Sequence, residues 1–126
     1  MKTRVLVAED NKDILILLRL WLERLNYEVI AAKDGIKAVE LATAETPDLI
    51  IMDIVMPKLS GLEAASQIKN NPETQGIPIL AVTGTGQPRS QKNDLQTVCD
   101  GYIAKPFTLQ NLEAAIRRLL KDSSSP

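Results

Sequence analysis

The chain has 126 residues, of which 44% are hydrophobic and 25% are charged, and this balance predicts a single soluble globular domain. Its 15 basic and 16 acidic residues give a formal net charge of -1, which does not favour direct DNA binding, and no apolar run is long enough to span a membrane. The chain has no histidine and only one cysteine, Cys99, which excludes histidine triads and an intrachain disulfide and is typical of a cytoplasmic protein.

Short apolar runs alternate with helical patterns along the chain. Several of these runs are apolar on successive residues, as expected for strands that are covered on both faces of a sheet. The run at 27–32 is weaker and is expected nearer a sheet edge. In chain order the predicted strands are residues 3–8, 27–32, 48–53, 77–82 and 101–104.

Each predicted strand is followed by a predicted helix, and four of these helices begin at a residue type that caps helices well. The fourth helix is less typical, because the Gly- and Pro-rich segment 84–88 precedes it. In chain order the helices run from Asp10 or Asn11 to about Leu25, from Asp34 to before Pro47, from Ser60 to about Asn70, from the 84–88 loop to about Val98, and from Thr108 to about Lys121.

This alternation of strands and helices predicts an α/β fold: a doubly wound, five-stranded parallel sheet of the (βα)5 type with helices on both faces. We expect one domain at residues 1–121 and a flexible tail at 122–126. The five residues after Lys121 are too few to form a domain, so we expect output through partner binding or onward phosphotransfer.

Polar side chains stand at the carboxyl ends of four predicted strands. Glu9 and Asp10 follow the first strand, and Asp53 ends the third. Thr83 follows the fourth strand, and Lys105 follows the fifth. Ligands of such sheets bind outside the carboxyl ends of the strands, so these residues are expected to meet at one rim. A surface ion pair between Asp53 and Lys105 would explain two of them, but not the whole set.

The three carboxylates of Glu9, Asp10 and Asp53 would repel one another by roughly 3–4 kcal/mol per pair at a separation of about 4–5 Å. A divalent cation would offset this repulsion, and an all-oxygen site favours Mg²⁺ over zinc. A carboxylate beside Mg²⁺ and the Lys105 ammonium is a plausible acceptor for a phosphoryl group. The sequence therefore predicts a magnesium site at which Asp53 is phosphorylated.

Four sequence motifs resemble the receiver domain of bacterial two-component response regulators. They are E-D at 9–10, D-I-V-M-P at 53–57, T at 83 and Y-I-A-K-P at 102–106. The resemblance covers about the whole chain. It implies a flavodoxin-like fold, Mg²⁺ as cofactor, and a phosphorylation-switched signalling module rather than an enzyme, apart from its own phosphotransfer and autodephosphorylation.

The resemblance also implies a role for each matching position, and a cis peptide bond between Lys105 and Pro106 is typical of the family. The implied roles are Asp53 as phosphoacceptor, Glu9 and Asp10 as the acid pair, the Val55 backbone carbonyl as a further Mg²⁺ ligand, Thr83 as the hydroxyl that moves to the phosphoryl group, Tyr102 as the aromatic switch residue, and Lys105 as the lysine that contacts the phosphate.

A histidine kinase or a histidine phosphotransfer protein is the expected phosphodonor, and the downstream partner is an unknown protein. Ile16 and Leu20 fall on the outer side of the first predicted helix and, with Pro57, form a candidate docking patch for the donor. The helix is expected to turn a broad apolar stripe inward, made of Ile14, Leu17, Leu18, Trp21, Leu22 and Leu25.

Other readings of the same residues remain open. A phosphatase with an aspartate nucleophile would need a second acid two residues after Asp53, where Val55 stands. A flavodoxin-like protein that binds FMN would need a phosphate loop after the first strand, where Glu9 and Asp10 would repel the phosphate. The chain could also be a receiver cut from a larger regulator or a hybrid kinase.

Overall fold

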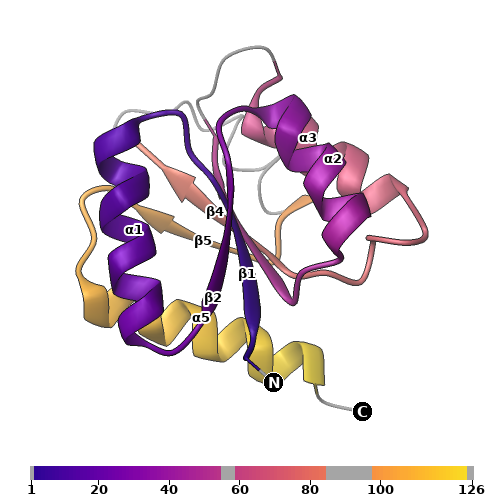
Figure 1. Cartoon of the computed structure of the whole chain (residues 1–126). Coiled ribbons are helices and arrows are strands. Elements are labelled where there is room, and N and C mark those ends of the chain that lie inside the picture. The colour runs from indigo at the N-terminus through magenta and orange to yellow at the C-terminus, as the bar shows by residue number, and fades with distance from the viewer. Residues whose placement is uncertain (1, 55–58, 85–97, 125–126) are drawn as a thin grey trace.

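The computed structural model describes residues 2–54, 59–84 and 98–124, and this part of the chain forms one parallel sheet flanked by helices (Figure 1). The order of strands across the sheet is β2-β1-β3-β4-β5, so the predicted doubly wound sheet is confirmed and β2 lies at an edge, as expected. The strands are β1 (Arg4–Ala8), β2 (Glu28–Ala32), β3 (Leu49–Asp53), β4 (Ile79–Thr83) and β5 (Gly101–Ala104).

Helices cover both faces of the sheet. α1 and α5 pack on one face, and α2 and α3 lie side by side on the other (Figure 1). The expected helix that ends near Val98 falls mostly outside the described residues. Within the described residues, no helix has the length and apolar character needed to cross a membrane. The helices are α1 (Lys12–Arg24), α2 (Gly35–Glu45), α3 (Gly61–Asn70) and α5 (Leu109–Ser124).

Successive residues of the central strands contribute to two separate apolar cores. In β1, Val5 and Val7 pack toward α1 and α5, whereas Leu6 and Ala8 pack toward α2 and α3. All of β3 and β4 is buried. Because burial of each large apolar side chain stabilises the fold by about 1.5–3 kcal/mol, the two cores fix the positions of the strand ends.

The starts of the helices follow from capping side chains, as predicted. Asn11, rather than Asp10, caps α1, and its Oδ1 accepts the N–H of Asp13 at 2.9 Å. Asp34 and Ser60 cap α2 and α3 in the same way. These caps satisfy backbone donors that the helix itself leaves unpaired, so each helix begins at a defined distance from the strand before it.

Two predicted details differ from the structure. α5 continues to Ser124 and so takes in part of the expected tail. Leu17 does not point inward, because 44% of it is exposed. The fully buried side of α1 is centred on Leu18 and Leu22, and this narrow stripe leaves their neighbour Leu17 on the outer face.

Candidate functional site

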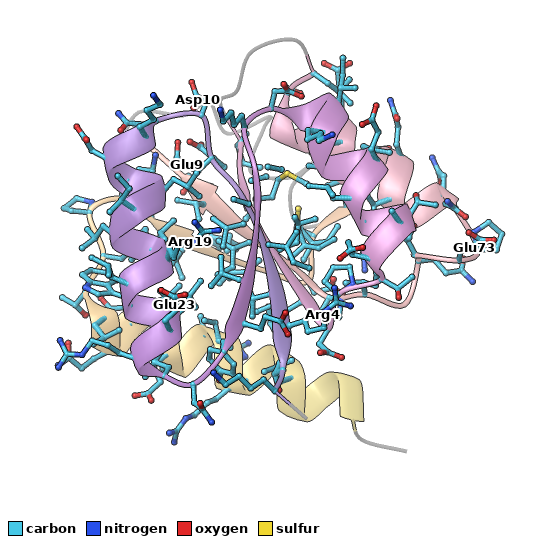
Figure 2. The ribbon with its side chains drawn as sticks, viewed as in Figure 1. Arg4, Glu9, Asp10, Arg19, Glu23 and Glu73 are labelled. Atoms are coloured by element: carbon cyan, nitrogen blue, oxygen red, sulfur yellow. The ribbon has the colours of Figure 1, made fainter. Side chains whose placement is uncertain are left out.

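Three acidic side chains meet where β1 and β3 end, beside the point at which the strand order reverses. Ala8 pairs with Met52, so Glu9 and Asp53 leave the two strands at the same level. Figure 2 shows Glu9 and Asp10 at one end of the molecule and Arg4, which begins β1, at the other.

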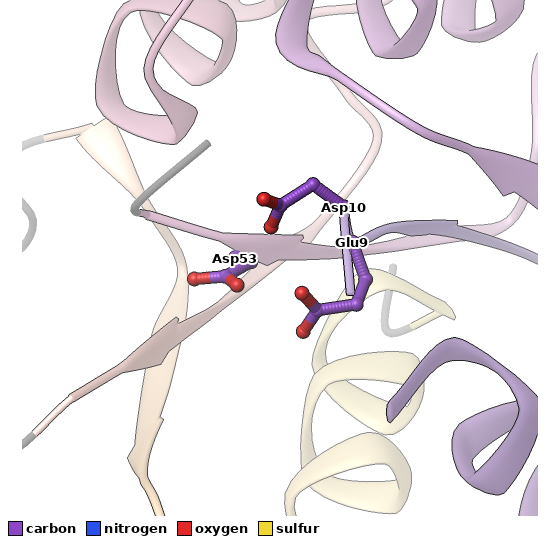
Figure 3. Close-up of side chains that lie close together, drawn as sticks. All are labelled: Glu9, Asp10 and Asp53. Atoms are coloured by element: carbon purple, nitrogen blue, oxygen red, sulfur yellow. The ribbon is translucent and has the colours of Figure 1, made fainter. Parts of the chain in front are cut away.

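The three carboxylates lie close enough to share one cation. Each offers an oxygen, and these oxygens lie within 4.8 Å of one another (Figure 3). Glu9 and Asp53 are buried, with 2% and 6% of their surface exposed, whereas Asp10 is exposed. The cluster therefore has two buried carboxylates and one that reaches solvent.

Glu9 is held from two sides by the backbone. Its own N–H donates to the carbonyl oxygen of Ala32 at 3.0 Å, which continues the pairing of β1 with β2. Its Oε2 accepts the N–H of Asn11 at 3.1 Å. The residue that caps α1 thus also positions the first acid of the site.

Lys105 places a positive charge beside the carboxylates of Glu9 and Asp53. Its backbone N–H donates to the Thr83 carbonyl at 2.7 Å. This bond lies just beyond the last residue pair of β4 and β5, which is Thr83 with Ala104. Its Nζ lies 3.2 Å from Asp53 Oδ2 and 3.5 Å from Glu9 Oε1. The peptide bond from Lys105 to Pro106 is cis, as the resemblance implied.

The pKa values of two of these groups are shifted by their surroundings. Burial raises the pKa of Glu9 from 4.5 to about 7, with Asp53 adding to the rise, while the Asn11 N–H and Lys105 work against it. Burial alone would lower the pKa of Lys105, but the Asp53 and Glu9 carboxylates outweigh it and raise that pKa. A second positive charge at the site would release the Glu9 proton near neutral pH.

The donor set fits Mg²⁺. All the side-chain ligands are carboxylate oxygens, which hard cations prefer, and few protein ligands leave room for the waters that Mg²⁺ retains. Glu9, Asp10 and Asp53 could hold such an ion. The predicted fourth ligand, the Val55 carbonyl, lies outside the described residues.

Thr83 and Tyr102 sit on the neighbouring strands β4 and β5. Asp53 pairs with Val82, and Thr83 follows Val82 at the end of β4, so Thr83 lies at the same rim as Asp53. Thr83 is 6% exposed, and its hydroxyl donates to the Ile103 carbonyl at a long 3.4 Å. Tyr102 is 50% exposed. A weakly held hydroxyl and an outward aromatic ring leave both side chains able to rearrange.

The predicted docking residues of α1 are on the surface, with Ile16 57% and Leu20 55% exposed. Pro57, the third member of the predicted patch, lies outside the described residues. On the adjoining side of α1 an apolar groove of about 240 Å³ runs between the helix and the segment after β5. The groove is lined by Ile14, Leu17, Leu18, Trp21, Lys105, Pro106 and Phe107.

The sequence reasoning missed the part played by Gly61. A Cβ on this residue would overlap the backbone carbonyl of Asp53, and its N–H donates to the Ile54 carbonyl at 2.9 Å. Gly61 therefore lets α3 begin directly against the strand end that presents Asp53. The only signal in the sequence was a glycine at the start of the predicted helix, and it does not reveal which backbone the residue touches.

A model of the response regulator receiver domain family matches residues 5–117. The chain belongs to this family. The resemblance to receiver domains that the sequence motifs indicated is thereby confirmed. The family consists of signalling proteins rather than metabolic enzymes.

Relatives and solved structures of receiver domains agree with this assignment. The polar-differentiation response regulator DivK of Brucella anthropi is 35% identical over 123 residues, which is 98% of this chain and 100% of the relative. The alkaline phosphatase synthesis transcriptional regulatory protein PhoP of Bacillus subtilis is also 35% identical, but the match spans only 50% of its length.

Among solved structures, the receiver domain of the sensor histidine kinase PA1611 from Pseudomonas aeruginosa is 30% identical, with a TM-score of 0.89. The match covers 96% of this chain and 99% of that one. That structure has a magnesium ion coordinated in its active-site cleft. Receiver domains of this fold thus occur both as whole chains and within larger proteins.

Proposed function

We propose that this chain is a phosphorylation-switched signalling module in which Asp53 accepts a phosphoryl group from a phosphohistidine. The donor would be a histidine kinase or a histidine phosphotransfer protein, and the reaction would depend on Mg²⁺. One observation carries the proposal: a buried Asp53 carboxylate lies 3.2 Å from the Lys105 ammonium, inside a cluster of acids that suits a divalent cation.

In this proposal each residue at the rim has a defined task. An oxygen of Asp53 would attack the phosphorus as the bond from phosphorus to the donor's histidine nitrogen breaks. The imidazole would leave with the donor, and Lys105 would offset the charge on the transferred group. Glu9, Asp10 and Asp53, with the Val55 carbonyl, would hold Mg²⁺, which supplies further positive charge to the phosphoryl oxygens. Burial of Asp53 excludes the water that would otherwise screen these interactions.

The switch would use Thr83 and Lys105, whose present partners would be joined or replaced by the phosphoryl group. The phosphoryl group adds about -1.5 to -2 charge and strong hydrogen-bond acceptors. Thr83 would leave the Ile103 carbonyl, to which it is bound weakly, and Tyr102 would turn inward from its half-exposed position. Two contacts of about 1.5–3 kcal/mol each, from Thr83 and Lys105, would shift a two-state equilibrium roughly a hundredfold or more.

The phosphodonor would dock on Ile16 and Leu20 of α1, together with Pro57. α1 begins two residues after Asp10, so a helix that lies on this patch would reach the rim. Output would pass to a downstream protein in the cytoplasm, without direct DNA or membrane binding by this chain. An Ile16→Asp variant that folds normally should accept phosphoryl groups from its donor protein more slowly, and an unchanged transfer rate would remove the docking proposal.

Intact-mass measurement after incubation with acetyl phosphate and Mg²⁺ tests the central step. Wild-type protein should gain one labile phosphoryl group, and omission of Mg²⁺ should prevent this. Asp53→Asn should stay unmodified, while Asp48→Asn, an acid just before the start of the same strand, should react as wild type does. Labelling of Asp53→Asn would mean that another residue is the acceptor.

A further inference from the structure

The outer face of α1 carries an apolar stripe that no described element of the chain covers. Ile16, Leu17 and Leu20 are 57%, 44% and 55% exposed. Leu20 lies four residues after Ile16 and three after Leu17, so it is a neighbour of both on the helix surface and joins them into one stripe. Single exposed apolar residues are ordinary, but three neighbours on one helix form a patch that favours a partner.

Charged residues flank this stripe in an order that reverses from one end to the other. Lys12 and Asp13 begin α1, and Glu23 and Arg24 end it, so the charges read plus, minus, then minus, plus. Asp13, Leu17, Leu20 and Arg24 are three or four residues apart and share one face. None of the four charged side chains forms an ion pair with another residue in the described part of the chain.

We infer that this face binds a second copy of the chain, with the two α1 helices packed antiparallel about a two-fold axis between Leu17 and Leu20. Leu17 of each copy then meets Leu20 of the other. Asp13 of each copy meets Arg24 of the other, and on the flank Lys12 meets Glu23. Every contact occurs twice, as a symmetric isologous interface requires.

The charge pattern selects this arrangement over a parallel one. In a parallel pair with the same register, Asp13 would face Asp13 and Arg24 would face Arg24, and both contacts would be repulsive. The antiparallel pair turns them into attractive contacts around an apolar centre, much as flanking charges set the partner choice of coiled coils. Arg19, the remaining charge on the outer side, lies farther round the flank, one turn from Glu23 (Figure 2).

The association should be weak and concentration-dependent. One helix from each copy contributes a small surface compared with the roughly 1,200–2,000 Å² that stable interfaces bury. The apolar groove between α1 and the segment after β5 adjoins Leu17 and Trp21, and it adds apolar area at the margin of the contact. Wild-type protein should therefore pass from monomer to dimer as its concentration rises.

The dimer would also cover Ile16 and Leu20. If these side chains meet the phosphodonor, a consequence that rests on the proposed function, self-association and docking exclude one another. The dimer itself requires neither Mg²⁺ nor phosphorylation. Its test therefore stays separate from the test of phosphoryl transfer.

Sedimentation equilibrium of charge-reversal variants, at concentrations up to on the order of 1 mM, tests this interface. Asp13→Arg and Arg24→Asp should each dimerise roughly tenfold more weakly than wild type, because two attractive pairs become repulsive. An equimolar mixture of the two variants should associate as wild type does, since every pair between unlike copies is again attractive. The double variant Asp13→Arg/Arg24→Asp should regain self-association for the same reason.

Apolar variants provide the second arm of the test. Leu20→Asp should abolish self-association, whereas Ile36→Asp, which changes a residue of similar exposure on α2, should not affect it. Circular dichroism melting confirms that each variant is folded. A wild-type protein that stays monomeric throughout, variants that self-associate unchanged, or a mixture that stays monomeric would each overturn the inference.

Discussion

A carboxyl group that is buried beside another carboxylate keeps its proton to a higher pH than it would in water. Glu9 is in this position: burial raises its pKa from 4.5 to about 7, and Asp53 adds to the rise. Lys105 and the Asn11 N–H reduce the rise without cancelling it. In the metal-free protein the proton is thus part of what makes this burial tolerable.

This shift predicts how stability depends on pH. Because folded Glu9 binds its proton more tightly than unfolded Glu9, the free energy of unfolding should fall as pH rises from about 4.5 to 7. The loss should be on the order of 2–3 kcal/mol in EDTA. Urea unfolding of wild type and Glu9→Gln should give similar stabilities near pH 5 and a more stable variant at pH 8. A constant difference across this range would contradict the shifted pKa.

The absence of a side chain at Gly61 lets the end of β3, which carries Asp53, pack directly against the start of α3. Gly61→Ala would force its Cβ against the Asp53 carbonyl, so the strand end or the start of α3 must move. We expect a loss of about 1–3 kcal/mol in unfolding free energy and slower labelling by acetyl phosphate. Gly76→Ala is the matched control, because no atom lies within 4 Å of the added Cβ. Equal behaviour of the two variants would show that the close approach is unimportant.

At the scale of single elements, the cap of α1 links a helix to the site. Asn11→Ala removes the side-chain acceptor for the N–H groups of Asp13 and Ile14 and should lower the unfolding free energy by about 1 kcal/mol. Asn11→Ser keeps a capping oxygen and should lose only part of this. Thermal melting compares the stabilities of the two variants. An equal loss of stability in both would mean that the capping oxygen is not what stabilises α1.

Elements were predictable from the sequence where a local pattern determines them. Apolar runs that end at Asp53 or at Glu9 identify the strands, and the parallel-sheet rule then brings the acids to one rim. Asn11, Asp34 and Ser60 identify helix starts because capping depends on nearby backbone alone. The roles of all the site residues, Val55 and Pro57 included, stay predictions.

The details that the sequence could not provide depend on contacts between distant segments. Leu17 and Leu18 are both apolar, and only packing against the sheet and α5 decides which of them is buried. The pKa of Glu9 depends on how deeply the folded chain encloses it. The contact of Gly61 with Asp53 depends on how the chain turns between β3 and α3, which no periodic pattern encodes.

At the scale of the whole molecule, an ion bound at the rim should stabilise the fold, because the ligands come together only when the sheet is formed. With Mg²⁺ at about one hundred times its dissociation constant, the free energy of unfolding should rise by about 2.7 kcal/mol. The gain should shrink below pH 7, since protons compete for Glu9.

Variants of two exposed acids make this prediction specific. Asp10→Asn should lose most of the stabilisation by Mg²⁺, as measured by thermal melting at pH 8. Glu73→Gln should keep it, because Glu73 lies far from Asp10, on the other side of the molecule (Figure 2). A similar Mg²⁺ effect in both variants would mean that the ion acts elsewhere.

The most direct test of the account is to identify the residue that carries the phosphoryl group. After reaction with acetyl phosphate and Mg²⁺, borohydride reduces an acyl phosphate and marks its position in a peptide digest. The arrangement of Asp53 beside Lys105 predicts that the mark falls on Asp53 alone. A mark on Glu9, on Asp10 or on any residue away from the rim would contradict the account.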